Sequence, residues 1–374
     1  MVEGLDMEKI TRRTKKETVR NIRESILNPI EHSAKTKVEF LDSGSIVLNL
    51  VLSGKKKNGG WARGRVVNIV GDGSSGKTLL ALEAAANCFY KLNKNPETFP
   101  PVKKIYIVYN NVEGVMDFPV EEMYGEKFFE AVEWIQIPTV QAFGRDYTRR
   151  VKSLKEGEFL LYIVDSLDAM SSEEELDNFL DAANKDTPEK GSYGMSKQKY
   201  SGKFFGNLCS IGQGKDSTLI IISQVRENIN VMFGEKYRRS GGKSLDFYTH
   251  QCCWLAVKRK LEKTYKGETR PYGILVKAKL KRSKVSKAFR EAEFVILFDY
   301  GVDDILSSII YLYGEKEKNI VFEGEDFKNQ EKLIEYITSH KLKDKLANMV
   351  EDKWMSVEEN IKVKRERKFK CEDT

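Results

Sequence analysis

The sequence predicts an α/β fold with a mostly parallel, twisted sheet, and three observations support this prediction. An apolar strand (Val66–Val70), a glycine loop (Gly71–Lys77) and a helix from Thr78 follow one another directly. A second apolar strand, Leu160–Val164, ends at Asp165. Further apolar stretches of strand length alternate with helical patterns along the chain, which is typical of sheets built from strand–helix–strand units.

The glycine loop fits the pattern G-x-x-x-x-G-K-[ST]. Glycines let the backbone turn so that consecutive N–H groups point at phosphate oxygens, and the following helix adds the partial positive charge of its N-terminus. We expect Lys77 to reach the β- and γ-phosphates of ATP and the Thr78 hydroxyl to bind Mg²⁺. A purely structural loop is the alternative, but the strand before it and the helix after it favour a nucleotide site. The expected ATP-binding residues of this loop are Gly71, Asp72, Gly73, Ser74, Ser75, Gly76, Lys77 and Thr78.

The composition is that of a globular protein in a reducing compartment. The chain has 374 residues, 40% hydrophobic and 32% charged, which allows one large domain with appendages or two to three domains. Its N-terminus is charged, and no apolar run reaches the length of a membrane span. Five scattered cysteines favour the cytoplasm over a disulfide framework or a zinc site. The formal net charge of +7 is compatible with a nucleic-acid partner.

The rest of the chain is arranged around the strand–loop–helix unit. Residues 5–28 predict a basic helix that ends at Pro29 and either lies on its own core or docks on a neighbouring subunit. Residues 301–374 predict helices joined by charged loops, followed by a basic tail. The other expected strands are 104–109, 134–137, 219–223, 250–258, 272–279 and 293–298, and the other expected helices are 140–154, 303–311, 328–339 and 342–350.

Two acidic residues follow predicted strands, at the edge where ligands of parallel sheets bind. Glu113 comes after the strand 104–109, and a carboxylate there can orient or deprotonate the water that attacks the γ-phosphate. An ordinary loop acid is the alternative. Asp165 directly follows a buried strand, an arrangement that holds Mg²⁺ through a water molecule. The predicted metal ligands are therefore Thr78 and Asp165, and the predicted catalytic residues are Glu113 and Lys77.

A stretch farther along the chain carries a more specific signal. It reads Gln224-Val225-Arg226, then Val231-Met232-Phe233-Gly234, then Gly241-Gly242 and Leu245–Tyr248. Together with the GDGSSGKT loop, this string resembles the RecA family of recombinases. The resemblance covers about Ser43 to Phe298, and it implies a RecA-like P-loop ATPase core.

The resemblance assigns roles around the nucleotide. Glu113 matches the catalytic glutamate of the family, although this chain has Asn111 where the family usually has an aspartate. Asp117 matches a family residue that contacts the adenine. Gln224 matches the residue that senses the γ-phosphate and couples it to DNA binding. An amide suits that role because it can bind or release phosphate without changing its charge.

The resemblance also implies two positively charged side chains that act on a neighbouring subunit. RecA-like filaments place two cations of one subunit in the ATP site of the next, just before a segment that reads here Phe289–Phe294. Counting back from it puts Arg282 and Lys284 at those positions. Cations from a neighbour would stabilise charge that develops on the transferred phosphate. The alternatives for this basic stretch are a solvated face and a nucleic-acid patch.

The resemblance also implies two DNA-binding loops, at about 171–203 and 225–240. Basic side chains there would meet DNA phosphates, and the apolar pair in the second loop would wedge between bases. The alternatives are an ordinary solvated loop for the first segment and an apolar anchor to the core for the second. The expected DNA-binding residues are Lys197, Lys199, Lys203, Arg226, Val231, Met232, Arg238 and Arg239.

As a whole, the sequence predicts an ATP-dependent homologous recombinase. It would form helical filaments on single-stranded DNA with ATP and Mg²⁺ and exchange strands with a homologous duplex. We expect a helical oligomerisation arm (1–40), a RecA-like ATPase core (41–300) and a small α-rich C-terminal domain with a basic tail (301–374). We expect no membrane association and a location in the cytoplasm, or in the host cytoplasm for a phage protein. The alternatives are a hexameric RecA-like helicase or motor, and a DNA-coating mediator filament with a slow ATPase.

Overall fold

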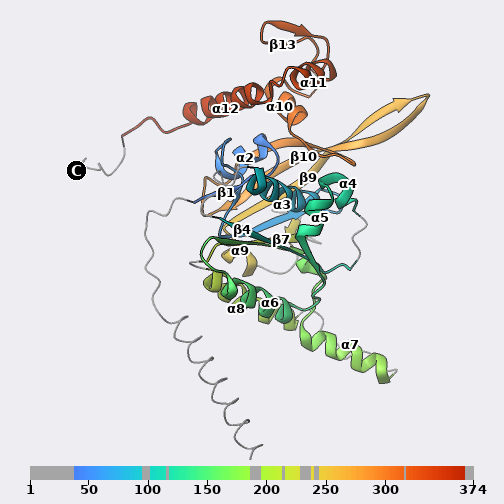
Figure 1. The fold of residues 1–374 in the computed structure, drawn as a ribbon, viewed down its shortest axis with the longest axis vertical. Helices are drawn as coiled ribbons and strands as arrows, with labels where there is room; N and C mark the ends of the chain where they lie inside the picture. The colour runs from blue at the N-terminus through green and yellow to red at the C-terminus, as the bar shows by residue number, and fades with distance from the viewer. Residues whose placement is uncertain are drawn as a thin grey trace, which may run out of the picture.

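One large sheet of ten strands forms the centre of the described part of the chain (Figure 1). The computed structural model describes residues 38–94, 102–114, 118–185, 195–212, 215–227, 237–239, 244–315 and 317–366. The strands follow one another across the sheet as β12 (Gly301–Asp303), β11 (Glu291–Leu297), β10 (Glu268–Ser283), β9 (Gln251–Tyr265), β3 (Val66–Gly71), β7 (Ser217–Glu227), β6 (Glu158–Asp165), β4 (Lys104–Asn111) and β5 (Val132–Ile135), with β8 (Tyr237–Arg239) beside β7.

The strands from β5 to β9 in this order are all parallel to one another. Beyond β9 the sheet continues antiparallel through β10, β11 and β12. The C-terminal ends of the parallel strands therefore lie along one side of the sheet, which we call the carboxyl edge. Their N-terminal ends lie along the opposite side, which we call the amino edge. The predicted α/β fold with a mostly parallel sheet is confirmed.

Helices cover both faces of the sheet, and this explains why its central strands are apolar throughout (Figure 1). All residues of β3 are buried, as is typical of a parallel strand with a layer on each side. One face carries α2 (Ile46–Ser53), α3 (Lys77–Lys94), α4 (Val120–Tyr124) and α5 (Glu126–Ala131). The other face carries α6 (Val140–Ser153), α8 (Met195–Gly212) and α9 (Ser244–Tyr248). The smaller elements are the paired β1 (Phe40–Leu41) and β2 (Trp61–Ala62) and the 3₁₀ turn η2 (Leu167–Ala169).

The segment 171–203 was predicted as a polar loop, but helices occupy much of it. α7 (Glu173–Lys185) begins with a capping box. The Ser172 hydroxyl accepts a hydrogen bond from the Glu175 N–H at 3.1 Å, and the Glu175 carboxylate accepts one from the Ser172 N–H at 2.9 Å. The prediction of a loop was wrong because it weighed the polar composition of the segment and not this Ser-x-x-Glu signal.

The hairpin of β9 and β10 is longer than the predicted strands 250–258 and 272–279. It extends from the sheet as a two-stranded ribbon (Figure 1) and closes at Lys266 and Gly267, which have φ angles of 49° and 84°. Positive φ at both residues is the geometry of a tight hairpin turn. The apolar pattern missed this extension because most side chains of the ribbon are exposed and charged.

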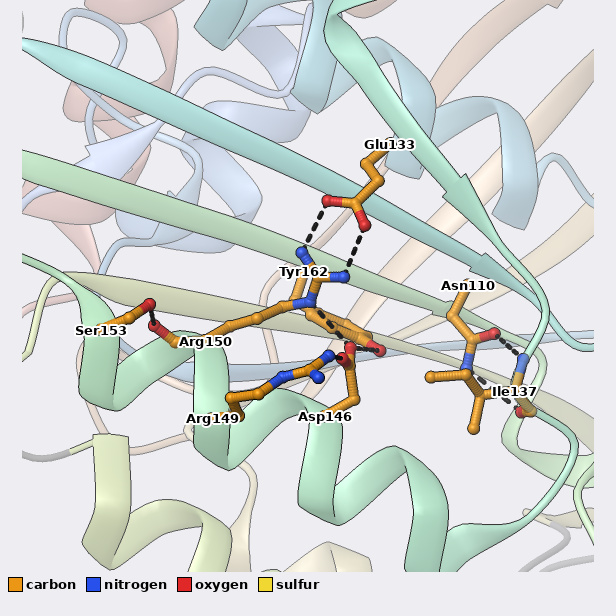
Figure 2. A network of polar contacts seen from close by, with 8 residues as sticks. All are labelled: Asn110, Glu133, Ile137, Asp146, Arg149, Arg150, Ser153 and Tyr162. Carbon is orange, nitrogen blue, oxygen red and sulfur yellow. Dashed lines mark hydrogen bonds and ion pairs between the residues drawn. The ribbon is translucent and has the colours of Figure 1, made fainter.

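β5 begins and ends two residues earlier than the predicted strand 134–137. The reason is visible in Figure 2, where Asn110 faces the backbone of Ile137. The Ile137 N–H donates to the Asn110 Oδ1 at 2.8 Å, so a side chain replaces strand pairing at this position. The chain after β5 is therefore fixed by β4 without continuing the ladder.

A second part of the same network ties α6 to the sheet (Figure 2). Arg150 of α6 makes two hydrogen bonds of 2.6 Å to Glu133 of β5 and one of 2.8 Å to the buried Asp146. The Tyr162 hydroxyl of β6 donates to Asp146 at 3.1 Å. The charge of Asp146 is thus compensated inside the structure, as a buried carboxylate requires.

The C-terminal part of the described chain is rich in helices, as predicted, and also contains a small hairpin. Many of its apolar side chains form a cluster of their own, Leu306 and Ile310 pack against β9, β10 and β11, and Val350 and Trp354 pack into the main core. Its elements are α10 (Asp304–Tyr313), β13 (Ile320–Phe322), β14 (Glu325–Phe327), α11 (Gln330–Ser339) and α12 (Lys343–Asn360). No helix of the described ranges is both long and apolar enough to cross a membrane. The predicted N-terminal helix and the last eight residues of the tail lie outside the described residues.

Candidate nucleotide and DNA site

The residues predicted to hold the nucleotide meet at the carboxyl edge. In the strand register Gly71 lies beside Gln224, and Asn111 lies beside Asp165. Glu113 follows two residues after the end of β4. Four strands, β3, β7, β6 and β4, therefore contribute to one site.

The glycine loop folds as its motif requires. Gly76 has a φ angle of 87°, and a Cβ atom there would lie 2.3 Å from the Ile296 Cδ1, so the position demands glycine. The Ser75 hydroxyl and the Lys77 Nζ donate to the Asp72 carbonyl, at 2.8 and 2.5 Å, which closes the loop. Burial lowers the pKa of Lys77, and nearby carboxylates oppose this shift. The ammonium group lies at the start of α3, where a phosphate is favoured by the helix N-terminus.

Asp165 is the centre of the predicted metal site. The Thr78 hydroxyl and the Tyr109 hydroxyl donate to the same carboxylate oxygen, Oδ2, at 2.5 and 2.6 Å. Burial raises the pKa of Asp165, and these two hydrogen bonds oppose the shift. Mg²⁺ prefers such hydroxyl and carboxylate oxygens, and it commonly takes one or two protein ligands beside water and substrate phosphates. The residues present therefore fit Mg²⁺.

Glu113 lies beside the proposed phosphate sensor Gln224. The Ser166 hydroxyl donates to the Glu113 Oε1 at 2.9 Å, and the side-chain amide of Gln224 approaches the same oxygen at 3.5 Å. The backbone N–H of Gln224 donates to the Asp168 Oδ2 at 2.6 Å. A carboxylate oriented in this way beside a phosphate site can position an attacking water molecule.

Three polar residues of this site were not among the predicted ones. They are Tyr109, Ser166 and Asp168. Tyr109 lies inside an apolar run, where a tyrosine indicates a core position. Ser166 and Asp168 follow Asp165 closely, so a cluster of polar residues at a strand end was the signal that could have found them.

The arginines predicted to contact DNA differ in their placement. Arg226 is exposed on β7 and lies opposite Arg238 of β8, whose backbone alone is described. The side chain of Arg239 is only 2% exposed, and its Nε lies 3.2 Å from the Asp246 carboxylate. A phosphate contact needs an exposed guanidinium group, so the prediction for Arg239 is corrected. Arg239 joins β8 to α9 instead.

Other predicted site residues are not tested by side-chain positions. The backbone of α8 is described, but not the side chains of Lys197, Lys199 and Lys203. Outside the described residues lie Asp117, Val231 and Met232. Their predicted roles remain predictions.

The two cations predicted to act on a neighbouring subunit lie at the amino edge. Ser283, between Arg282 and Lys284, pairs with Gln251, which pairs in turn with Val67 at the start of β3. The glycine loop follows the other end of β3. The two cations are therefore separated from the nucleotide site of their own subunit by the length of this strand.

An exposed aromatic ring accompanies these cations. Phe247 of α9 is 61% exposed, and the Arg282 guanidinium lies over its ring at 5.7 Å. The Lys284 Nζ donates to the Phe247 carbonyl at 2.6 Å. Aromatic and arginine side chains are enriched in protein interfaces, so this part of the amino edge has the character of a contact surface.

A comparison with models of protein families shows to which family the chain belongs. The model of the RecA N-terminal domain matches residues 9–95 and 151–303, which together are more than half of the chain. The chain belongs to the RecA family. The resemblance predicted from the GDGSSGKT loop and the Gln224–Tyr248 string is thereby confirmed.

Curated RecA proteins are similar to this RecA-family chain over most of their length. Protein RecA of Arthrospira platensis is 28% identical over 299 residues, which cover 75% of this chain and 71% of that protein. Protein RecA of Trichodesmium erythraeum is 27% identical over 321 residues, with 82% and 78% covered. Protein RecA of Prochlorococcus marinus strain MIT 9215 is 26% identical over 355 residues, with 89% and 84% covered.

The family model does not match residues 96–150, which include Glu113 and Tyr109. The predicted role of Glu113 is therefore supported by its position after β4 and by its contact with Ser166, and not by the family model.

Replacing Glu113 by glutamine is expected to lower DNA-stimulated ATP hydrolysis by at least about 100-fold, because an amide cannot accept a proton from water. Binding of a fluorescent ATP analogue is expected to change less than about threefold, since the lost interaction is with the attacking water. Glu121→Gln, in α4 outside the site, is the matched control and should leave both quantities unchanged. A loss of hydrolysis below about tenfold would exclude Glu113 as the general base.

Proposed function

We propose that this RecA-family protein is an ATP-dependent homologous recombinase that forms filaments on single-stranded DNA and exchanges strands with a homologous duplex. One observation carries the proposal: a single strand joins the nucleotide site to the predicted DNA segment. β7 presents Gln224 at the carboxyl edge, presents Arg226 two residues later and leads into the segment that returns as β8. Nucleotide and DNA would thus act on the same strand.

The residues of the carboxyl edge would hydrolyse ATP. The N–H groups of the glycine loop and the Lys77 ammonium group would bind the phosphates. Thr78 and Asp165 would hold Mg²⁺, which supplies positive charge to the phosphate oxygens when it is bound. Glu113, oriented by the Ser166 hydroxyl at 2.9 Å, would position the attacking water and accept its proton.

Gln224 would report the γ-phosphate to the DNA-binding segment. Its amide approaches Glu113, and its backbone is hydrogen-bonded to Asp168. A γ-phosphate offers oxygens that the amide can bind in place of the Glu113 carboxylate, without any change in charge. The end of β7 would then take a different position with ATP than with ADP, and the affinity for DNA would change with it.

The sites would form between subunits. Arg282 and Lys284 lie at the amino edge, and the glycine loop lies at the carboxyl edge. If the cations serve an ATP molecule, that molecule belongs to another copy of the chain. Such a head-to-tail interface produces a filament when the rotation between subunits does not close and a ring when it does. The resemblance to RecA recombinases favours the filament, with residues 1–40 as the arm that joins neighbours.

The function is tested by joint-molecule formation between circular single-stranded DNA and a homologous linear duplex. We expect joint molecules that require ATP and Mg²⁺, and no unwinding of a tailed duplex. Unwinding of the tailed duplex without joint molecules would indicate a ring-shaped motor instead of a recombinase. DNA coating without joint molecules, without unwinding and without DNA-stimulated hydrolysis would indicate a mediator filament.

The shared ATP site is tested by mixing two inactive variants. Lys77→Ala keeps both cations, and Lys284→Ala keeps an intact glycine loop. In an equal mixture about a quarter of the head-to-tail interfaces combine the intact loop with the intact cations. We expect the mixture to recover about a quarter of the wild-type ATPase rate, although each variant alone is nearly inactive.

A mixture of Lys77→Ala with Glu113→Gln is the matched control for this experiment. Both changes lie at the carboxyl edge, so every subunit in that mixture has a defective ATP site and no interface is complete. Recovery in neither mixture would contradict the assignment of Lys284 to the ATP site of a neighbour.

A further inference from the structure

Tyr109 is a buried polar residue in the middle of an apolar strand. Its side chain has no exposed surface, and the ring of Trp134 lies 5.3 Å away. A hydroxyl in such a position destabilises the fold unless it finds a partner. The Tyr109 hydroxyl donates to the Asp165 Oδ2 at 2.6 Å. A core tyrosine therefore contacts the carboxylate of the proposed metal site.

The hydrogen bonds around Asp165 assign its two oxygens to different tasks. Oδ2 accepts from Tyr109 and from Thr78. Since the proton of the Thr78 hydroxyl is used in this bond, its lone pairs remain for a metal ion. No donor to the other oxygen, Oδ1, is recorded among the residues that the structure describes, which leaves Oδ1 for metal-bound water.

We propose that Tyr109 is a positioning residue for the Mg²⁺ site. Its hydroxyl fixes the Asp165 carboxylate so that Oδ2 receives the Thr78 proton and Oδ1 stays available to the water shell of the metal. Tyr109 would act through Asp165 and would touch neither nucleotide nor metal. The inference rests on the proposed ATP-dependent function, and it adds a residue outside the motifs that predict that function.

A purely structural role for Tyr109 is the alternative, and the neighbouring strand supplies a control for it. Tyr162 of β6 is also fully buried, and its hydroxyl donates to the buried Asp146 at 3.1 Å. Tyr162 faces the opposite layer of the protein, with α6 (Figure 2). Replacing either tyrosine by phenylalanine removes one oxygen and one hydrogen bond to an aspartate, but only Tyr109 is connected to the site.

The experiment compares Tyr109→Phe with Tyr162→Phe in binding of a fluorescent ATP analogue. Binding is measured across a Mg²⁺ titration and again with excess EDTA, in the absence of DNA. For Tyr109→Phe we expect the half-saturating Mg²⁺ concentration to rise about tenfold, because Asp165 loses one of two charge-assisted hydrogen bonds. Binding in EDTA should be unchanged. Tyr162→Phe should match the wild type in both conditions.

Two results would overturn the inference. One is a Mg²⁺ dependence of Tyr109→Phe that equals that of Tyr162→Phe. The other is an equal loss of binding with Mg²⁺ and with EDTA, which would indicate a structural role. Wild-type protein that fails to bind the analogue with Mg²⁺ would instead contradict the proposed ATPase itself, and the inference would fall with it.

Discussion

Parallel pairing of β4, β6, β7 and β3 is the constraint on which the site depends. It sets Asn111 beside Asp165 and Gly71 beside Gln224, although these residues come from distant parts of the chain. A shift of one residue in any of these pairings would turn the side chains of that strand to the opposite face. The layers of helices on both faces fix the register, because each face of the sheet buries its own set of apolar side chains. The chemistry of the carboxyl edge is thus a consequence of core packing.

The same sheet presents a different surface at its other edge. Arg282, Lys284 and the exposed Phe247 lie at the amino edge, and the glycine loop lies at the carboxyl edge. Two different surfaces at opposite ends of one sheet suit a head-to-tail assembly, in which every subunit offers one surface and receives the other. In the proposed function, ATP bound between subunits would stabilise the assembly, and hydrolysis would weaken it.

Local signals beside apolar strands pointed to the glycine loop and Asp165, and the resemblance to the RecA family pointed to Gln224. The strand register brings all three to the carboxyl edge, and their roles remain predictions. Contacts between distant residues were not predictable in this way. Tyr109 has the pattern of a core residue, and only the fold brings it to Asp165. Arg239 was predicted to contact DNA because the resemblance places it in a DNA-binding loop, but its side chain is buried beside Asp246. The Ser-x-x-Glu sequence at the start of α7 is also a local signal, but the polar composition of the segment led to the prediction of a loop.

The central claim is that nucleotide state reaches the DNA-binding segment through Gln224. The most direct test is the affinity for single-stranded DNA with a non-hydrolysable ATP analogue and with ADP, in wild-type protein and in Gln224→Ala. With nucleotide concentrations that saturate both proteins, we expect the wild type to bind DNA at least about tenfold more tightly with the analogue, and the ratio to fall to about one in the variant. A variant that keeps the wild-type ratio would contradict the claim.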